Sequence, residues 1–248
     1  MKTAPVVLLH AFPLDSRMWR PQIPALNGCQ LWAPDLPGFG SAPALEPDLT
    51  LWAKWLITAA PGPALWVGLS LGGYVALEVV RQAPELVKGL LLADTHPYGD
   101  QPEVKSSRSQ QIVRLAREGN EFLAQSQPGR LLSPTSRTRR PGLAELVSQW
   151  IRENPPAGQA AALLAMLRRK PATDLLAQID FPTLVLGGQE DQITPPELMS
   201  GYAETIPTGR HLVIPQAGHL SNLEAPLAFN TALLGILAEV YGLNFPDQ

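Results

Sequence analysis

The chain has 248 residues, of which 45% are hydrophobic and 17% are charged, and its formal net charge is −3. This is an ordinary globular composition with enough apolar residues for a large buried core. The weak negative charge gives no reason to expect nucleic acid as a partner. The single cysteine, Cys29, cannot form an internal disulfide, which suits a reducing compartment.

The first apolar segment, residues 6–9, follows the N-terminus almost directly. It is too short for a signal peptide or a membrane span, and no small-residue cleavage site follows it. We therefore expect a cytoplasmic protein that has no membrane partner.

Six short apolar runs are continuous rather than alternating, and most are bracketed by proline. Continuous runs of this length are typical of strands that are buried on both faces, as in a parallel sheet covered by helices. They lie at residues 6–9, 31–33, 65–68, 89–93, 183–187 and 211–214.

Helical patterns follow several of these strands, and the alternation predicts a doubly wound α/β sheet. The predicted helices of this core lie at residues 16–26, 49–58, 71–82, 196–205 and 225–241.

The alternation stops between residues 94 and 173, where four helices are predicted in succession, at residues 103–117, 121–125, 141–152 and 159–169. From residue 97 to 171 there are 12 Lys or Arg and 6 Asp or Glu, which gives this segment a net charge of +6. The rest of the chain has 7 Lys or Arg and 16 Asp or Glu, a net charge of −9. We interpret residues 97–172 as an all-helical cap inserted into a core of residues 1–96 and 173–248. The alternative for its basic residues is that they only solvate exposed helix faces.

The segment Gly68-Leu69-Ser70-Leu71-Gly72 has the pattern G-x-S-x-G between a predicted strand and a predicted helix. A serine on such a sharp turn has a strained backbone and projects its hydroxyl above the sheet, and the small residues on either side prevent a collision. Ser70 is therefore the candidate nucleophile. The alternative is a serine that only caps the helix.

A serine hydroxyl needs a base to remove its proton. His219 lies in a loop between the last strand and the last helix, at the carboxyl end of the sheet, and it is the candidate base. His96 is a second candidate, whereas His10 is better placed to shape a loop and His211 opens a strand.

The acid that orients the histidine is expected after a strand, between the serine and the histidine in the chain. Glu190 and Asp191 both meet this condition, and Asp94 is a further alternative. Backbone amides that stabilise an oxyanion are expected at Leu71, after the serine, and at Phe12, since the following Pro13 has no amide hydrogen.

Five stretches in this order resemble motifs of the α/β-hydrolase superfamily, and the likeness covers nearly the whole chain: residues 8–12, 35–40, 68–72, 187–195 and 217–226. The resemblance favours Asp191 over Glu190 as the orienting acid. Residues 17–19, 22–26 and 91–95 look like the group of 3-oxoadipate enol-lactonases, carboxylesterases and related perhydrolases. The predicted cap is similar to that of the same group.

Three departures accompany the resemblance. The usual His-Gly of the first loop is His10-Ala11, and Ala11 is expected to restrict this loop and to narrow the acyl pocket. The family motif Gly-x-Gly-x-Ser begins here at Gly38, but Ala42 occupies its last position. The serine, Ser41, lies one position before the place where the family has it. The chain also starts at the strand that is third in larger members, so about six mainly parallel strands are expected.

The resemblance and the candidate residues together predict a serine hydrolase that cleaves small carboxylic esters or lactones through an acyl-enzyme. The alternatives are an enol-lactonase or C–C bond hydrolase acting on an anionic substrate, and a non-catalytic ligand-binding protein on the same scaffold. The histidines lack a ligand spacing such as H-x-x-x-H, so neither a metal nor a cofactor is expected.

Overall fold

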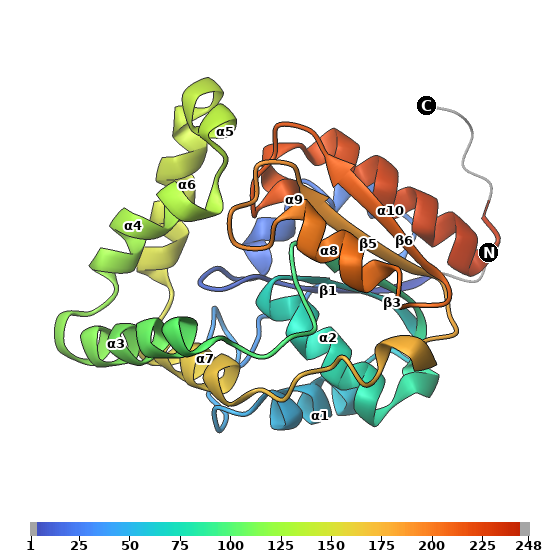
Figure 1. Cartoon of the computed structure of the whole chain (residues 1–248), viewed down its shortest axis with the longest axis horizontal. Coiled ribbons are helices and arrows are strands. Elements are labelled where there is room, and N and C mark those ends of the chain that lie inside the picture. The colour runs from blue at the N-terminus through green and yellow to red at the C-terminus, as the bar shows by residue number, and fades with distance from the viewer. Residues whose placement is uncertain (1–3, 244–248) are drawn as a thin grey trace.

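The computed structural model describes residues 4–243, so the outermost residues of the predicted core, 1–3 and 244–248, lie outside the described range. Six parallel strands form one sheet in the order β2-β1-β3-β4-β5-β6, which confirms the predicted fold class (Figure 1). The strands are β1 (Pro5–Leu9), β2 (Gln30–Trp32), β3 (Ala64–Leu69), β4 (Val87–Ala93), β5 (Thr183–Gly188) and β6 (Gly209–Ile214).

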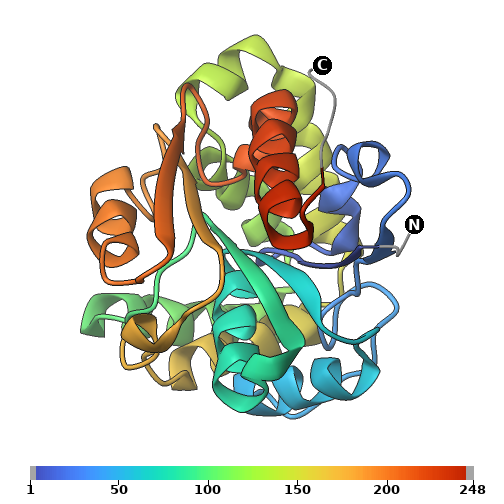
Figure 2. The ribbon, with the colours of Figure 1, turned by 90° about the vertical axis from the view of Figure 1, so that its right-hand side faces the viewer.

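The four central strands are buried at almost every position, which explains why their sequences are apolar throughout. Helices α1 (Leu49–Ala59) and α2 (Leu71–Gln82) cover one face of the sheet, and α10 (Pro226–Tyr241) covers the other (Figure 2). Two shorter helices, α8 (Pro196–Ala203) and α9 (Ser221–Glu224), follow β5 and β6.

The α-helix predicted for residues 16–26 is wrong. This segment forms two short 3-10 helices, Ser16–Trp19 and Pro24–Leu26. Pro21 and Pro24 lack backbone amide hydrogens, so a continuous series of α-helical hydrogen bonds cannot pass through the segment.

Five α-helices lie between β4 and β5 and form the predicted all-helical insertion, which lies to one side of the sheet (Figure 1). They are α3 (Pro102–Glu118), α4 (Glu121–Leu131), α5 (Pro134–Arg139), α6 (Pro141–Glu153) and α7 (Pro156–Arg168). Helix α3 packs on α7, and α4 packs on α6. None of the helices within residues 4–243 is long and apolar enough to cross a membrane.

The helix predicted at residues 121–125 is too short, because α4 continues through Pro128. A proline inside a helix leaves the carbonyl four residues earlier without its usual donor. That carbonyl belongs to Ala124, and it accepts a 2.8 Å hydrogen bond from the hydroxyl of Ser148 on α6. Helix α5 was not predicted, although the side chain of Ser133 caps it by accepting from the amide of Ser136.

Candidate active site

Ser70 occupies the turn between β3 and α2, with φ 53° and ψ −113°. A positive φ is unusual for a residue with a side chain and is maintained here by the packing around the turn. A Cβ atom on Gly68 would overlap the backbone of Gly72, and one on Gly72 would overlap the carbonyl of Leu9. Only glycine therefore fits at these two positions.

Ser70, His219 and Asp191 come together at the carboxyl ends of β3, β5 and β6. Ser70 Oγ lies 2.9 Å from Nε2 of His219, and Nδ1 of His219 lies 2.8 Å from Oδ2 of Asp191. The side chains of His219 and Asp191 are 2% and 0% exposed, so water does not compete for their contact. The arrangement can pass a proton from the serine hydroxyl to the imidazole.

Asp191 is held by three hydrogen bonds from two residues that follow it closely in the chain, Ile193 and Thr194. Its Oδ1 accepts hydrogen bonds from the amides of Ile193, at 2.8 Å, and Thr194, at 3.1 Å. The Thr194 hydroxyl donates to Oδ2 at 2.5 Å. Burial raises the pKa of Asp191, but the interaction with His219 and these hydrogen bonds outweigh burial and hold the pKa below its usual value.

The charges around His219 favour its protonated form. Burial alone lowers the pKa of the imidazole, but the carboxylates of Asp191, Asp94 and Glu224 raise it, and the net result lies above the ordinary value of 6.5. An imidazolium formed at this position is therefore stabilised by its surroundings.

Asp94, the alternative acid, is fully buried but has other partners. Its Oδ1 accepts a 2.9 Å hydrogen bond from the amide of Gly188, and its Oδ2 accepts a 2.5 Å bond from the Ser221 hydroxyl. Burial and the negative charge of Asp191 raise its pKa well above the usual value. Asp94 thus connects the loop of Asp191 to the segment after His219 rather than contacting the imidazole.

The other candidate residues point elsewhere. Glu190 accepts a 2.6 Å hydrogen bond from the hydroxyl of Thr135 on α5. His96 lies 3.2 Å from the phenol of Tyr74, and burial together with the charge of Arg169 lowers its pKa to about 4.

The two remaining histidines do not reach Ser70. His10 is fully buried, and its Nε2 accepts a 2.8 Å hydrogen bond from the amide of Leu36, which fixes the loop after β2. His211 lies within the edge strand β6.

Glu224 was not singled out in the sequence, yet it holds the loop of His219. One of its carboxylate oxygens accepts hydrogen bonds from the amides of Gly218, at 2.9 Å, and Leu220, at 3.2 Å. These amides flank the histidine on both sides. Glu224 lies within the stretch 217–226 that resembles a family motif, but no role was assigned to it there, whereas the Asp-x-x-Thr spacing of Asp191 and Thr194 is a recognisable turn signal.

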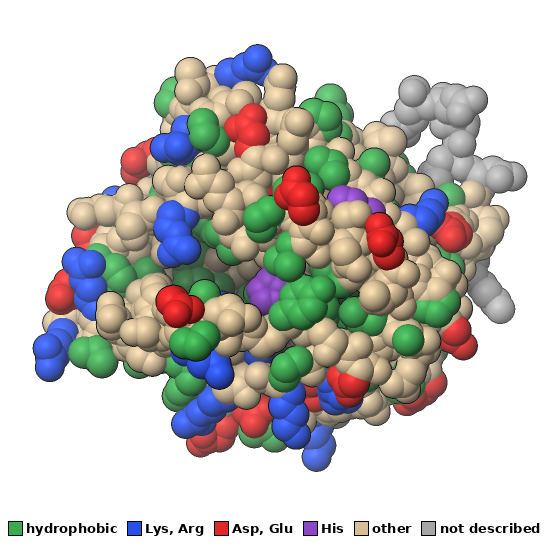
Figure 3. All heavy atoms as spheres, in the orientation of Figure 1, with side chains coloured by type: hydrophobic (Ala, Val, Ile, Leu, Met, Phe, Trp, Pro, Cys, Tyr) green, Lys and Arg blue, Asp and Glu red, His purple; other side chains and the backbone are tan. Residues whose placement is uncertain are grey.

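A cavity of about 710 Å³ opens beside Ser70 and His219, between the sheet and the helical insertion. Figure 3 shows this face hollowed, with a histidine side chain at the edge of the hollow. Phe12 lines the cavity, and within residues 4–243 the amides of Phe12 and Leu71 donate no hydrogen bond. Both amides are thus available to an oxyanion. Ala11 itself is fully buried and does not line the cavity, so any effect that it has on the pocket passes through the neighbouring Phe12.

Of the twelve basic residues in the insertion, Arg108 and Arg130 line this cavity. Arg108 forms an ion pair with Asp100 at 2.7 Å. Arg130 forms no ion pair with any residue from 4 to 243, and neither does Glu103 on the same wall. The formal charges of the four charged side chains that line the cavity sum to zero, and Asp100 also forms a 2.7 Å ion pair with Arg169, which does not line it. Among the described side chains, no three His, Cys, Asp or Glu residues group as a metal site would require.

Comparisons with known proteins agree with this architecture. A family model described as alpha/beta hydrolase fold matches residues 4–226. A pimeloyl-[acyl-carrier protein] methyl ester esterase of Shewanella woodyi is 30% identical over 242 residues, 92% of this chain and 91% of the relative. A Mycobacterium tuberculosis protein named as a non-heme bromoperoxidase, BpoC, is 32% identical over 193 residues, 72% of this chain and 69% of its own.

A solved structure of a thermophilic esterase from Thermogutta terrifontis, with malate bound, superimposes with a TM-score of 0.91 and 37% identity. The match covers 96% of this chain and 90% of that one. The extent of the family match confirms the predicted resemblance. The chain belongs to the α/β-hydrolase fold family.

Proposed function

We propose that this protein is a serine hydrolase that cleaves carboxylic esters of small molecules through an acyl-enzyme. The observation that carries the proposal is the continuous chain of contacts from Ser70 Oγ through His219 to Asp191, at 2.9 and 2.8 Å. The coarser prediction, an ester-cleaving hydrolase, is confirmed by the family match and by relatives that bear esterase names.

In the proposed reaction, His219 removes the proton of the Ser70 hydroxyl while the oxygen attacks the ester carbonyl. Asp191 holds the imidazole in the tautomer whose Nε2 accepts this proton, and it stabilises the imidazolium that forms. The tetrahedral intermediate collapses when His219 gives its proton to the departing alcohol, which leaves an ester between the acid part of the substrate and Ser70.

Two backbone amides, those of Phe12 and Leu71, stabilise the negative charge on the carbonyl oxygen in this step. Leu71 is also the first residue of α2, so the positive end of that helix faces the same oxygen. A water molecule, activated by His219, then attacks the acyl-enzyme and releases the acid. Water must still reach the acyl group, and the open cavity beside Ser70 allows this.

The helices α3–α7 serve in this proposal as a cap, residues 97–172, that covers the core of residues 1–96 and 173–248. The cap is fixed to the core near the Phe12 loop, because Asn154 donates a 2.7 Å hydrogen bond to Asp15 and accepts one from the amide of Gly40 at 3.0 Å. A cap of this kind excludes bulk water from the oxyanion and limits the size of the substrate. The lone Cys29 suits a cytoplasmic location.

The balance of charges in the cavity favours an uncharged ester as the first choice of substrate. Arg108 shares the carboxylate of Asp100 with Arg169, and Arg130 lines a wall that also contains Glu103. An anionic lactone, or a C–C bond hydrolase substrate, is the second candidate, because the unpaired guanidinium of Arg130 could receive its carboxylate. A non-catalytic binding protein would not need the contact between Ser70 and His219.

The proposal is tested by hydrolysis of p-nitrophenyl esters, neutral lactones and anionic lactones by the wild type and by Ser70→Ala. We expect the wild type to hydrolyse short p-nitrophenyl esters, and Ser70→Ala to lose at least about 10³-fold in kcat. Slow hydrolysis of every simple ester with rapid hydrolysis of one anionic lactone would instead favour the second candidate. Equal rates for wild type and Ser70→Ala would contradict both.

A further inference from the structure

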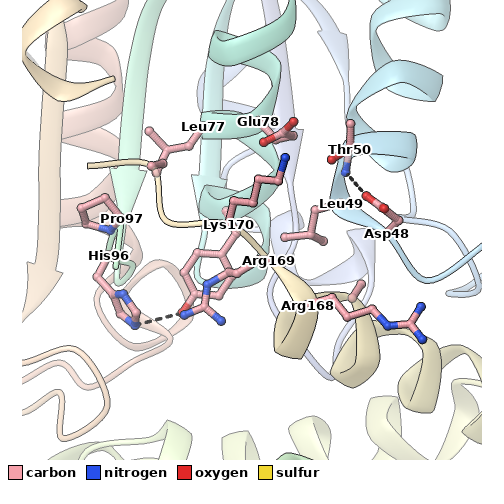
Figure 4. Close-up of a pocket in the computed structure, with 13 residues that line it drawn as sticks. Asp48, Leu49, Thr50, Leu77, Glu78, His96, Pro97, Arg168, Arg169 and Lys170 are labelled. Carbon is pink, nitrogen blue, oxygen red and sulfur yellow. Dashed lines mark hydrogen bonds between the residues drawn. The ribbon is translucent and has the colours of Figure 1, made fainter. Parts of the chain in front are cut away.

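A second, smaller cavity lies directly behind the wall of the substrate cavity. Its volume is about 80 Å³, and it lies between the end of α7, the start of α1 and the middle of α2 (Figure 4). Leu49, Leu77 and Pro97 give it apolar surface, and Arg168 and Lys170 lie at its outer side. It does not reach Ser70 or His219.

Two residues line both cavities, Tyr74 and His96, so they form the wall between them. Tyr74 lies one turn of α2 beyond Ser70 and is 8% exposed, and His96 follows β4. A 3.2 Å hydrogen bond joins the phenol to Nε2 of His96, and Figure 4 marks it as the dashed line from His96. The wall therefore consists of two aromatic side chains that support each other.

The wall is braced from both sides, so it is a fixed partition. The guanidinium of Arg169 lies 4.2 Å from the ring centre of Tyr74, and Arg169 itself forms a 2.7 Å ion pair with the buried carboxylate of Asp100. On the substrate side, the ring of His96 stacks on Tyr98 with centroids 5.9 Å apart. These contacts hold the phenol and the imidazole in one position each.

We propose that Tyr74 and His96 are specificity-determining residues, because their side chains close the end of the substrate cavity and set the longest ester chain that it accepts. The inference rests on the proposed ester hydrolysis. A chain that reaches the wall meets two hydrogen-bonded rings that their neighbours hold in place, although empty space lies beyond them. Truncation of either ring joins the two cavities and gives the chain room to extend.

The test compares wild type with Tyr74→Ala and His96→Ala on two ester series. In the first series the acyl chain of p-nitrophenyl esters lengthens from acetate to laurate; in the second, the alcohol of acetate esters lengthens. Each kcat/KM is divided by that of the shortest ester in the same series. We expect the relative kcat/KM of the wild type to fall sharply beyond one chain length in one of the two series. For the first ester beyond that length, both variants should have a relative kcat/KM about tenfold higher or more.

Two variants serve as matched controls. Tyr74→Phe keeps the ring and removes only the hydroxyl, so the chain length at which its kcat/KM falls should be the same as in the wild type. Leu163→Ala removes a buried side chain that lines the substrate cavity but not the second cavity. It therefore enlarges the substrate cavity without joining it to the second cavity, and it should move the chain-length cutoff less than Tyr74→Ala does.

Labelling of Ser70 by a fluorophosphonate shows that each variant is folded and active enough to compare, and His96→Ala provides the result if Tyr74→Ala does not fold. A cutoff that is the same in wild type, Tyr74→Ala and His96→Ala overturns the inference while leaving the proposed function intact. A wild type that hydrolyses no ester of either series overturns the proposed function, and this inference with it.

Discussion

The carboxylate of Glu224 accepts a 2.8 Å hydrogen bond from the amide of Ser133, and this bond joins the loop of His219 to the helical insertion. Ser133 is the residue that caps α5, whereas Glu224 ends α9, 91 positions later in the chain. The other oxygen of the same carboxylate holds the backbone on both sides of His219. A single buried side chain therefore fixes the position of the imidazole relative to the cap.

Replacement of Glu224 by glutamine tests this positioning. A glutamine offers one oxygen as acceptor, so its amino group must face at least one of the three backbone amides that the carboxylate now accepts from. We expect kcat to fall by about tenfold to a hundredfold with little change in KM, because the imidazole is displaced while the cavity is retained. Glu239→Gln, which removes only a surface pair with Arg210, is the control. An unchanged kcat in Glu224→Gln would rule out the positioning role.

The pH dependence of kcat/KM reports the pKa of His219 in the free enzyme. The imidazole works as a base only when it is unprotonated, and its carboxylate neighbours raise its pKa above 6.5. Activity should therefore fall as the pH is lowered, with a midpoint above 6.5. Removal of the Glu224 charge destabilises the imidazolium, so the midpoint of Glu224→Gln should move to lower pH. A wild-type midpoint below 6.5 would contradict this account of the charges.

The two buried aspartates near His219 are distinguished by their asparagine variants. Asp191→Asn removes the acceptor that fixes the imidazole tautomer, so we expect kcat to fall by about 10⁴-fold. Asp94→Asn leaves the imidazole contact intact and alters the bonds to Gly188 and Ser221 and one of the charges that raise the pKa of His219, so its effect on kcat should be much smaller. Steady-state rates on one p-nitrophenyl ester decide the matter. The opposite order would make Asp94 the orienting acid.

Ser148 should contribute to stability through the carbonyl that Pro128 leaves without a donor. In Ser148→Ala the carbonyl of Ala124 is left buried and unpaired, so the free energy of unfolding should fall by about 1–3 kcal/mol. Chemical denaturation measures the change. Ser126→Ala is the control, since the Ser126 hydroxyl makes an exposed bond within its own helix and its loss should change stability by no more than about 0.5 kcal/mol. Equal stability of the two variants would contradict this role.

Local sequence patterns predict much of the core and of the site. The bounds of α2 agree with the prediction, since Ser70 and its glycines mark where the helix starts and the pattern ends at Gln82. The order of serine, acid and histidine along post-strand loops likewise brings Ser70, Asp191 and His219 together in space.

Contacts between distant segments account for what the sequence does not predict. Helix α4 passes through Pro128 because a hydroxyl from α6 replaces the missing donor, and no window around Pro128 contains that information. The same holds for Glu224, whose partners lie 4, 6 and 91 positions away, and for the wall of Tyr74 and His96. Pro21 and Pro24, in contrast, are local signals against a continuous α-helix at residues 16–26.

The central claim, that Ser70 is the nucleophile, is tested most directly by covalent labelling with a fluorophosphonate followed by mass spectrometry. We predict one adduct per chain on the peptide that contains Ser70, none in Ser70→Ala, and much slower labelling in His219→Ala, with circular dichroism confirming that all three proteins are folded. A folded wild-type protein that acquires no adduct, or a Ser70→Ala variant that is labelled as readily as wild type, would contradict the claim.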